Sequence, residues 1–180
     1  RWIESYAEVI DHIDAVSIAV PTFLHRRVAG EFLERGIPVL VEKPLAGNLG
    51  DAQELVDLAA AQQTLLQVGH VERFNPATQA AWAECGAPKY IRGERLSPYA
   101  FRSMDIGVVH DLMIHDIDLV LSLVKSPLKH ANGLGFSILG EQEDVVQARL
   151  TFENGCVADL TANRVNPTAS RAMQVWSTAG

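Results

Sequence analysis

The sequence is poor in cysteine, in long apolar runs and in basic charge, and each shortage excludes a class of protein. Its two cysteines, Cys85 and Cys156, are too far apart to form a zinc motif, and we expect inert packing residues in a reducing cytoplasm. No run of about 18 apolar residues is present, which argues against a transmembrane helix. The formal net charge of −7 argues against nucleic acid and anionic membranes as partners.

The first third of the chain alternates short apolar runs with amphipathic segments. Strands are predicted at 15–20, 37–41 and 65–69, and helices at 25–35 and 48–63. This alternation is typical of βαβ units and a parallel sheet with right-handed crossovers. The second helix should turn five apolar side chains inward: Ala52, Leu55, Val56, Leu58 and Ala59.

The pattern changes in the second part of the chain. Helices are predicted at 76–84 and 108–124, and a strand is predicted at 90–96. The segment 135–176 has the pattern of further strands, with a hairpin turn at Asn154-Gly155. We therefore expect an α+β region whose sheet is mainly antiparallel.

A glycine-rich phosphate-binding turn of the form G-x-G-x-x-G is missing. The nearest segment, Gly133 to Gly135, lacks the third glycine and the helix that should follow it. Either the chain holds no dinucleotide-binding domain, or the first βα unit of such a domain lies outside this sequence. If the first βα unit lies outside this sequence, the fold class is α/β. Residues 1–74 are then the C-terminal part of a Rossmann-type domain, and residues 75–180 are an incomplete α+β domain for substrate binding or oligomerisation.

Three residues that seldom belong in a buried strand, Glu42, Lys43 and Pro44, end the second predicted strand. Charged side chains are rarely buried unpaired, and proline has no N–H to continue a ladder. Ligands of open α/β sheets bind at the carboxyl ends of the strands, so Lys43 is a candidate for the active site. The alternatives are a lysine that reaches water from a strand end and a glutamate in a structural ion pair.

Asp111, His115 and Asp118 are spaced by four and three residues, and they form a polar stripe on the helix predicted at 108–124. A polar stripe on an otherwise apolar helix must face water, a partner or a site. His115 suits proton transfer near neutral pH, with a satisfied helix-terminal histidine as the alternative, and a structural role is favoured for Asp118. His110 and His115 are roughly 140° apart around such a helix, so no metal site is predicted.

Other polar residues lie near predicted strand ends. His25 begins a helix, and the alternative for it is a surface histidine beside a capping Thr22. Asn75 precedes Pro76 and can be a ligand contact or an ordinary helix N-cap. Guanidinium groups could bind a nucleotide diphosphate, although a solvated strand face is the alternative. The candidates for an anionic substrate are Arg92, Arg95, Tyr99 and Arg102.

Three motifs together resemble the Gfo/Idh/MocA oxidoreductases, which are NAD(P)-dependent sugar and cyclitol dehydrogenases. They are 16–22 with His25, the Glu42-Lys43-Pro44 strand end, and Asp111-x-x-x-His115. The resemblance covers nearly all 180 residues. The segment 68–76 is most similar to the nucleotide-sugar branch, such as the UDP-N-acetylglucosamine 3-dehydrogenases. That family begins with a glycine-rich turn and runs past residue 180, so the resemblance implies a chain shortened at both ends.

The resemblance implies a role for each catalytic candidate. Lys43 steadies the substrate oxygen, His115 is the general base, and Asp111 binds or orients the substrate. With the strand-end positions, it also yields the expected contacts with NAD or NADP, which are Pro21, Thr22, His25, Glu42, Lys43 and Arg73. The expected contacts with the substrate are Asn75, Arg92, Arg95 and Asp111.

The predicted function is hydride transfer between NAD(P) and the hydroxyl-bearing carbon of a sugar, with a nucleotide sugar as one option. The alternatives are a non-catalytic Rossmann-like binding or oligomerisation module, an inactive fragment, and a reductase of a non-sugar ring. The joint presence of Lys43, Asp111 and His115 favours the enzyme, because a module freed from catalysis has no chemical need for all three. We also expect a homo-oligomer, a dimer or a tetramer, formed through the last sheet, whose edges need covering.

Overall fold

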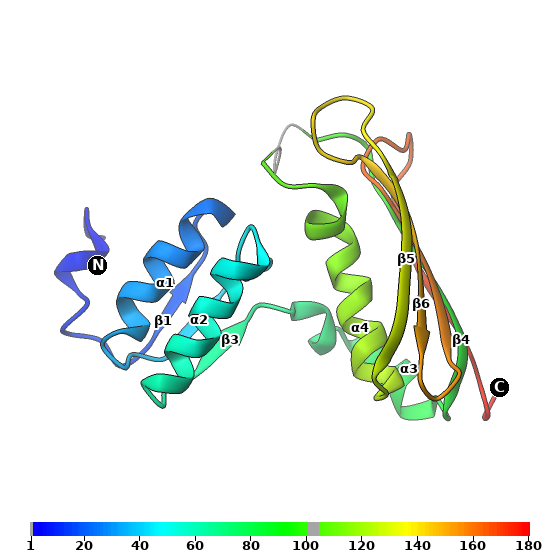
Figure 1. Cartoon of the computed structure of the whole chain (residues 1–180), viewed down its shortest axis with the longest axis horizontal. Helices are drawn as coiled ribbons and strands as arrows, with labels where there is room; N and C mark the ends of the chain where they lie inside the picture. Colours follow the sequence, from blue (N-terminus) through cyan, green and yellow to red (C-terminus); the bar gives the residue numbers. More distant parts are fainter. Residues whose placement is uncertain (1, 101–104) are drawn as a thin grey trace. The chain divides into compact units, whose positions relative to one another are not determined.

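The computed structural model describes residues 2–100 and 105–180, which divide into two compact units (Figure 1). One unit ends at His70 and the other begins at Val71. The break therefore falls just before residue 74, where the sequence suggests a boundary. The first unit has a parallel sheet and the second a mixed, mainly antiparallel sheet with helices, which confirms the predicted α/β fold class.

The first unit is a parallel sheet of three short strands with two crossover helices. The strands β1 (Val16–Ile18), β2 (Val39–Val41) and β3 (Leu66–Val68) lie in that order. The helices α1 (His25–Leu33) and α2 (Leu49–Ala61) pack side by side (Figure 1). Short 3₁₀ turns cover Tyr6–Glu8 and Thr22–Leu24. The most deeply buried residues of its core are at most 1% exposed, among them Phe32, Leu33, Val39, Val41 and Leu55.

The ends of the two helices follow local chemistry. Asn48 caps α2, because its Oδ1 accepts the Asp51 backbone N–H at 2.9 Å. Gly36 follows α1 with φ +70°, a conformation that glycine adopts without strain. The prediction that Val56 faces inward is wrong, since its side chain is 46% exposed. The buried side of α2 follows Leu55 and Ala59, and Val56 is turned about 100° away from Leu55.

The second unit begins with two helical segments and contains one mixed sheet. A 3₁₀ turn, η3 (Val71–Phe74), leads into α3 (Pro76–Glu84), whose bounds are those predicted. The sheet has the order β5-β6-β7-β4-β8, in which β4 and β7 are parallel and all other pairs are antiparallel. Its strands are β4 (Pro88–Leu96), β5 (Leu128–Phe136), β6 (Val145–Phe152), β7 (Val157–Asn163) and β8 (Ser170–Ser177).

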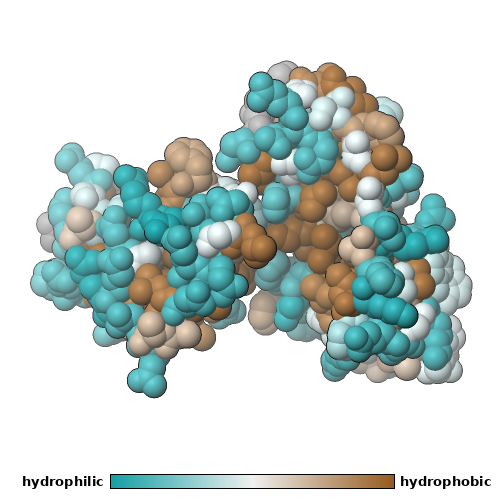
Figure 2. Space-filling model, in the orientation of Figure 1, coloured by the Kyte–Doolittle hydropathy of each residue, from teal (hydrophilic) through white to brown (hydrophobic). Residues whose placement is uncertain are grey.

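A long helical segment packs on one face of this sheet. Its first part, η4 (Val109–Met113), is π-helical, and α4 (Ile114–Val124) continues it. Apolar side chains of this segment, with Ile91 and Leu160 of the sheet, form the core of the unit. Figure 2 shows apolar residues gathered over α4. Among the described residues, no helix is both long and apolar enough to cross a membrane.

Two details of the second unit differ from the sequence prediction. The helix at 108–124 begins with a π-helical part, so side-chain directions near Asp111 do not follow an α-helical period. Strand β5 begins at Leu128, before the predicted 135, and all nine of its residues are exposed. Gly133 and Gly135 lie inside this strand, paired with Ala148 and Val146 of β6, and so form no phosphate-binding turn.

Candidate active site

Lys43 lies two residues after the end of β2, at the carboxyl edge of the parallel sheet. The Glu42 backbone N–H donates to the Ile18 carbonyl at 2.9 Å, which extends the pairing of β2 with β1 by one residue. The Lys43 backbone N–H donates to the Glu42 carboxylate at 3.3 Å, and the Lys43–Pro44 peptide bond is cis. Lys43 is half-buried, while Pro44 is buried. The lysine thus stands where the strand stops, with its main chain held in place.

His25 lies in the interior, and its ring is only 1% exposed. The ring nitrogens lie 2.8 Å from the Pro44 carbonyl oxygen and 2.9 Å from that of Val20. This placement gives His25 a structural role in place of the predicted cofactor contact. The surface histidine beside a capping Thr22 is also not observed, because no side chain caps α1.

Pro21 and Thr22 follow β1 at the same edge of the sheet. Pro21 is exposed, and Thr22 is half-buried at the start of its 3₁₀ turn. Glu42 is exposed as well, with its carboxylate next to Gly69 at the end of β3. The ends of β1 and β2 therefore place four of the predicted cofactor contacts at one edge of the sheet, which are Pro21, Thr22, Glu42 and Lys43.

Asp111 and His115 belong to the helical segment of the second unit, and both are half-buried. Asp111 lies in the π-helical part, where its N–H donates to the Gly107 carbonyl at 3.0 Å. His115 lies in the first turn of α4. Lys43 belongs to the other compact unit.

Two aspartates close to His115 on α4 each form an ion pair with an arginine. The Asp118 carboxylate accepts two bonds from the Arg73 guanidinium, at 2.7 and 2.5 Å, which agrees with the structural role favoured for Asp118. The Asp116 carboxylate, 4% exposed, accepts two bonds from Arg95, at 3.1 and 2.7 Å. These ion pairs connect α4 to η3 through Arg73 and to β4 through Arg95, close to His115.

Arg95 also donates to the Glu72 carboxylate at 3.3 Å. Burial raises the pKa of Glu72, but the hydrogen bond from Asn75 and the charge and hydrogen bond of Arg95 outweigh burial and lower it, with a smaller electrostatic contribution from the His115 ring. Burial raises the pKa of Asp116, and its bond to Arg95 offsets only part of this effect. The charged form of Glu72 is thus favoured, and this carboxylate interacts electrostatically with the His115 ring.

The predicted contacts for an anionic substrate are not brought together. Arg95 is 6% exposed and its donors are used inside the unit, so it has a structural role in place of the predicted substrate contact. Arg92 lies on the opposite, exposed face of β4. Asn75 is the N-cap of α3, because its Oδ1 accepts the Ala77 N–H at 3.0 Å. Tyr99 is half-buried, and Arg102 lies outside the described residues.

Sequence reasoning missed Glu72 and Asp116 as neighbours of the candidate base. The alternation of β4 holds a usable signal, since Ile91 and Arg95 share one face, and an arginine on a core face requires buried carboxylates. The described residues contain no group of three or more histidine, cysteine, aspartate or glutamate side chains able to hold a metal ion.

Two family models match the chain. Residues 2–70 match an oxidoreductase family with an NAD-binding Rossmann fold, and residues 77–180 match the GFO/IDH/MocA C-terminal domain. The UDP-N-acetylglucosamine 3-dehydrogenase of Acidithiobacillus ferrooxidans is 37% identical over 177 residues, covering 98% of this chain and 56% of that protein. The scyllo-inositol 2-dehydrogenase (NAD(+)) of Bacillus subtilis is 29% identical, covering 93% of this chain and 54% of that protein.

A solved structure agrees with this result. The structure of the UDP-N-acetylglucosamine 3-dehydrogenase GnnA from Acidithiobacillus ferrooxidans superposes with a TM-score of 0.91 at 36% identity. The match covers 99% of this chain and 60% of that one. The chain therefore spans little more than half the length of the relatives that it matches.

Proposed function

Because the chain belongs to the Gfo/Idh/MocA oxidoreductases, with their NAD-binding Rossmann domain, we propose that it serves a dehydrogenase that moves a hydride between a sugar carbon and NAD or NADP. The observation that carries the proposal is the setting of Lys43, a lysine held by its main chain at the carboxyl edge of a parallel sheet. That edge is where cofactors bind in folds of this class.

The chain's own residues then supply positioning and charge. The Lys43 ammonium donates a hydrogen bond to the substrate oxygen and favours the negative charge that develops on it. His115 accepts the hydroxyl proton, and the nearby Glu72 carboxylate stabilises the imidazolium that results. Asp111 binds the substrate and orients it for this transfer.

The cofactor supplies the hydride acceptor when it is bound. The exposed strand ends suit this group, since Pro21 offers a flat apolar contact, and Thr22 and Glu42 offer hydrogen-bonding groups beside Lys43. Arg73 is a weaker candidate in our proposal, because its guanidinium already holds Asp118.

We propose a nucleotide sugar as the substrate class. Support comes from the relative at 37% identity, whose name gives UDP-N-acetylglucosamine as its substrate. The inositol-oxidising relative is less similar, at 29%, which makes a free cyclitol the second choice. Asn75 and Arg92 stay candidate substrate contacts in this proposal, although each has the structural placement described above.

The test is turnover in the full-length protein. UDP-sugars, free sugars and inositols are each incubated with NAD⁺ or NADP⁺, and reduced cofactor is followed by its absorbance. We expect turnover on a nucleotide sugar and a loss of about 100-fold or more in kcat for His115→Asn. Cofactor affinity should stay within a few-fold. His12→Asn, at an exposed histidine, is the matched control. Cofactor binding without turnover on any of these substrates would contradict the proposal and favour a non-catalytic module.

A further inference from the structure

We propose that His25 is a positioning residue for Lys43, and this inference rests on the proposed role of Lys43. The His25 ring links two loops that leave the carboxyl edge of the parallel sheet. One nitrogen lies 2.9 Å from the Val20 carbonyl oxygen, in the loop after β1. The other lies 2.8 Å from the Pro44 carbonyl oxygen, directly after Lys43. The ring thus ties the lysine's loop to the neighbouring loop.

Lys43 is held from both sides by side chains. On its amino side, its own N–H donates to the Glu42 carboxylate at 3.3 Å. On its carboxyl side, the carbonyl of the next residue, Pro44, meets His25. A lysine side chain is long and flexible, so the direction of its ammonium group depends on how firmly its backbone is fixed. The two contacts therefore restrict the backbone conformation at Lys43.

The chemistry of the ring explains why a histidine is buried there. Both neighbours are carbonyl oxygens, which only accept hydrogen bonds, and a neutral imidazole donates from one nitrogen at a time. The tautomer decides which of the two loops receives the hydrogen bond. An apolar side chain of similar size would fill the space but would leave that carbonyl without its donor. Packing alone therefore does not account for this residue.

We expect the loss of the His25 contacts to lower kcat more than it weakens the binding of substrate or cofactor. A catalytic group displaced by about 1 Å can cost roughly 100-fold in rate. We expect His25→Leu to lower kcat by about 10- to 100-fold while KM and cofactor affinity change by no more than about threefold. His25→Gln, which keeps a donor, should lie between His25→Leu and the wild type.

The decisive experiment is a double-mutant cycle with Lys43→Ala in the full-length enzyme. If His25 acts through Lys43, His25→Leu lowers kcat in the wild-type background and has almost no further effect in Lys43→Ala. Val28→Ala is the matched control, because Val28 is 4% exposed on the same helix and its truncation weakens packing while leaving the His25 ring and its two carbonyl contacts in place. It should leave kcat unchanged.

Three outcomes would overturn the inference. They are an equal loss from His25→Leu in both backgrounds, a similar loss of kcat in Val28→Ala, and a kcat in His25→Gln as low as in His25→Leu. If His25→Leu does not fold, the same cycle is run with His25→Gln, where an equal loss of kcat in both backgrounds counts against the inference. Full turnover in Lys43→Ala alone would instead refute the proposed role of Lys43, so the two failures are distinguishable.

Discussion

Two arginines three residues apart on β4 show how strand geometry separates like side chains. Arg95 faces α4, where it is 6% exposed and bonded to Asp116 and Glu72. Arg92 is exposed on the other face of the sheet. Successive side chains of a strand point to opposite faces, so residues with odd spacing cannot share one ligand. Arg95 therefore stabilises the fold, whereas we expect a substitution of Arg92 to change the free energy of unfolding little.

Replacing Arg95 by alanine should therefore destabilise the second unit strongly. The Asp116 and Glu72 carboxylates would lose their partner, and breaking a buried ion pair costs about 3–5 kcal/mol. Urea unfolding followed by circular dichroism measures this loss. Arg92→Ala, on the same strand, should change the free energy of unfolding by less than about 0.5 kcal/mol. Equal losses in the two variants would contradict the assignment of faces.

Asp144 is a second buried charge with a complete set of partners. One carboxylate oxygen accepts the Arg164 Nε–H at 2.7 Å, and the other accepts the N–H groups of Ile138 and Leu139, each at 2.7 Å. Burial raises the pKa of Asp144, but these hydrogen bonds and the arginine's charge outweigh it and lower the pKa below the ordinary 3.8. The charged form is thus favoured in the folded state.

This lowered pKa predicts how stability depends on acid. The folded state holds the proton less tightly than the unfolded state, so the contribution of Asp144 is complete above about pH 5 and disappears as the pH falls through the folded pKa. Asp144→Asn should lose at least about 2 kcal/mol at neutral pH and show a shallower fall in stability below pH 5. Chemical unfolding at a series of pH values checks both. Glu141→Gln, at an exposed position, should keep the wild-type profile.

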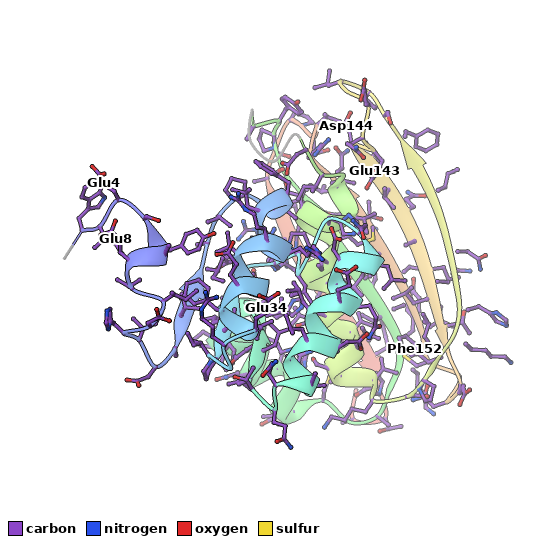
Figure 3. All side chains as sticks on the ribbon, turned by 60° about the vertical axis from the view of Figure 1, so that its left-hand side comes forward. Glu4, Glu8, Glu34, Glu143, Asp144 and Phe152 are labelled. Carbon is purple, nitrogen blue, oxygen red and sulfur yellow. The ribbon has the colours of Figure 1, made fainter. Side chains whose placement is uncertain are left out.

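At the scale of elements, the start of the helical segment depends on a contact that its own sequence does not contain. The Glu143 carboxylate, just before β6, accepts the Val109 N–H at 3.2 Å, and the Glu143 carbonyl accepts the Val108 N–H at 2.9 Å (Figure 3). The acidic group satisfies a free N–H at a helix start, where negative charge is also favoured. The lack of a side chain at Gly107 leaves room for the Glu143 carboxylate, since a Cβ at this position would overlap it.

Gly107→Ala should therefore disturb the turn that carries Asp111. The methyl group would push the Glu143 carboxylate away from Val109, and we expect a loss of about 1–2 kcal/mol, the usual cost of a lost helix cap. Activity should fall as well, because Asp111 donates its N–H to the Gly107 carbonyl. Thermal unfolding and kcat are measured together. Gly140→Ala, where a Cβ would meet nothing within 4 Å, serves as the control and should behave as the wild type.

At the scale of the whole molecule, the outer face of the second unit's sheet exposes several large apolar side chains among polar ones. Leu134 and Phe136 of β5 are 59% and 53% exposed, and Trp176 of β8 is 47% exposed. Large exposed apolar groups on one sheet face are typical of surfaces that are covered in an assembly. We propose that the full-length protein covers this face by forming a dimer or a tetramer.

Light scattering coupled to size-exclusion chromatography tests this proposal directly. The full-length protein should elute with the mass of two or four subunits. Leu134→Lys should shift the mass toward a single subunit, because a charge buried in an apolar interface is costly. Lys129→Ala, at an exposed position of the same strand, should leave the mass unchanged. A monomeric wild type would contradict the proposal.

Elements with a strong local signal were predictable, and those that depend on distant partners were not. The helix over 76–84 is fully predicted because Asn75 and Pro76 mark its start. The strand β5 is predicted too short, since its glycines and exposed residues lack the alternation of a half-buried strand. The hydrogen bond at the start of the π-helical part had no local signal, because the acceptor of the Val109 N–H, Glu143, lies 34 residues later in the chain.

The sequence by itself determined the order of elements, the fold class, the family and the candidate residues Lys43, Asp111 and His115. Periodicity, turn residues and short motifs are local properties, so they can be read from neighbouring positions. Only the tertiary structure decided the partners, such as the ring of His25 between two carbonyls and the carboxylates around Arg95. A buried polar group must find its hydrogen bonds, and the fold brings those from residues far away in the chain.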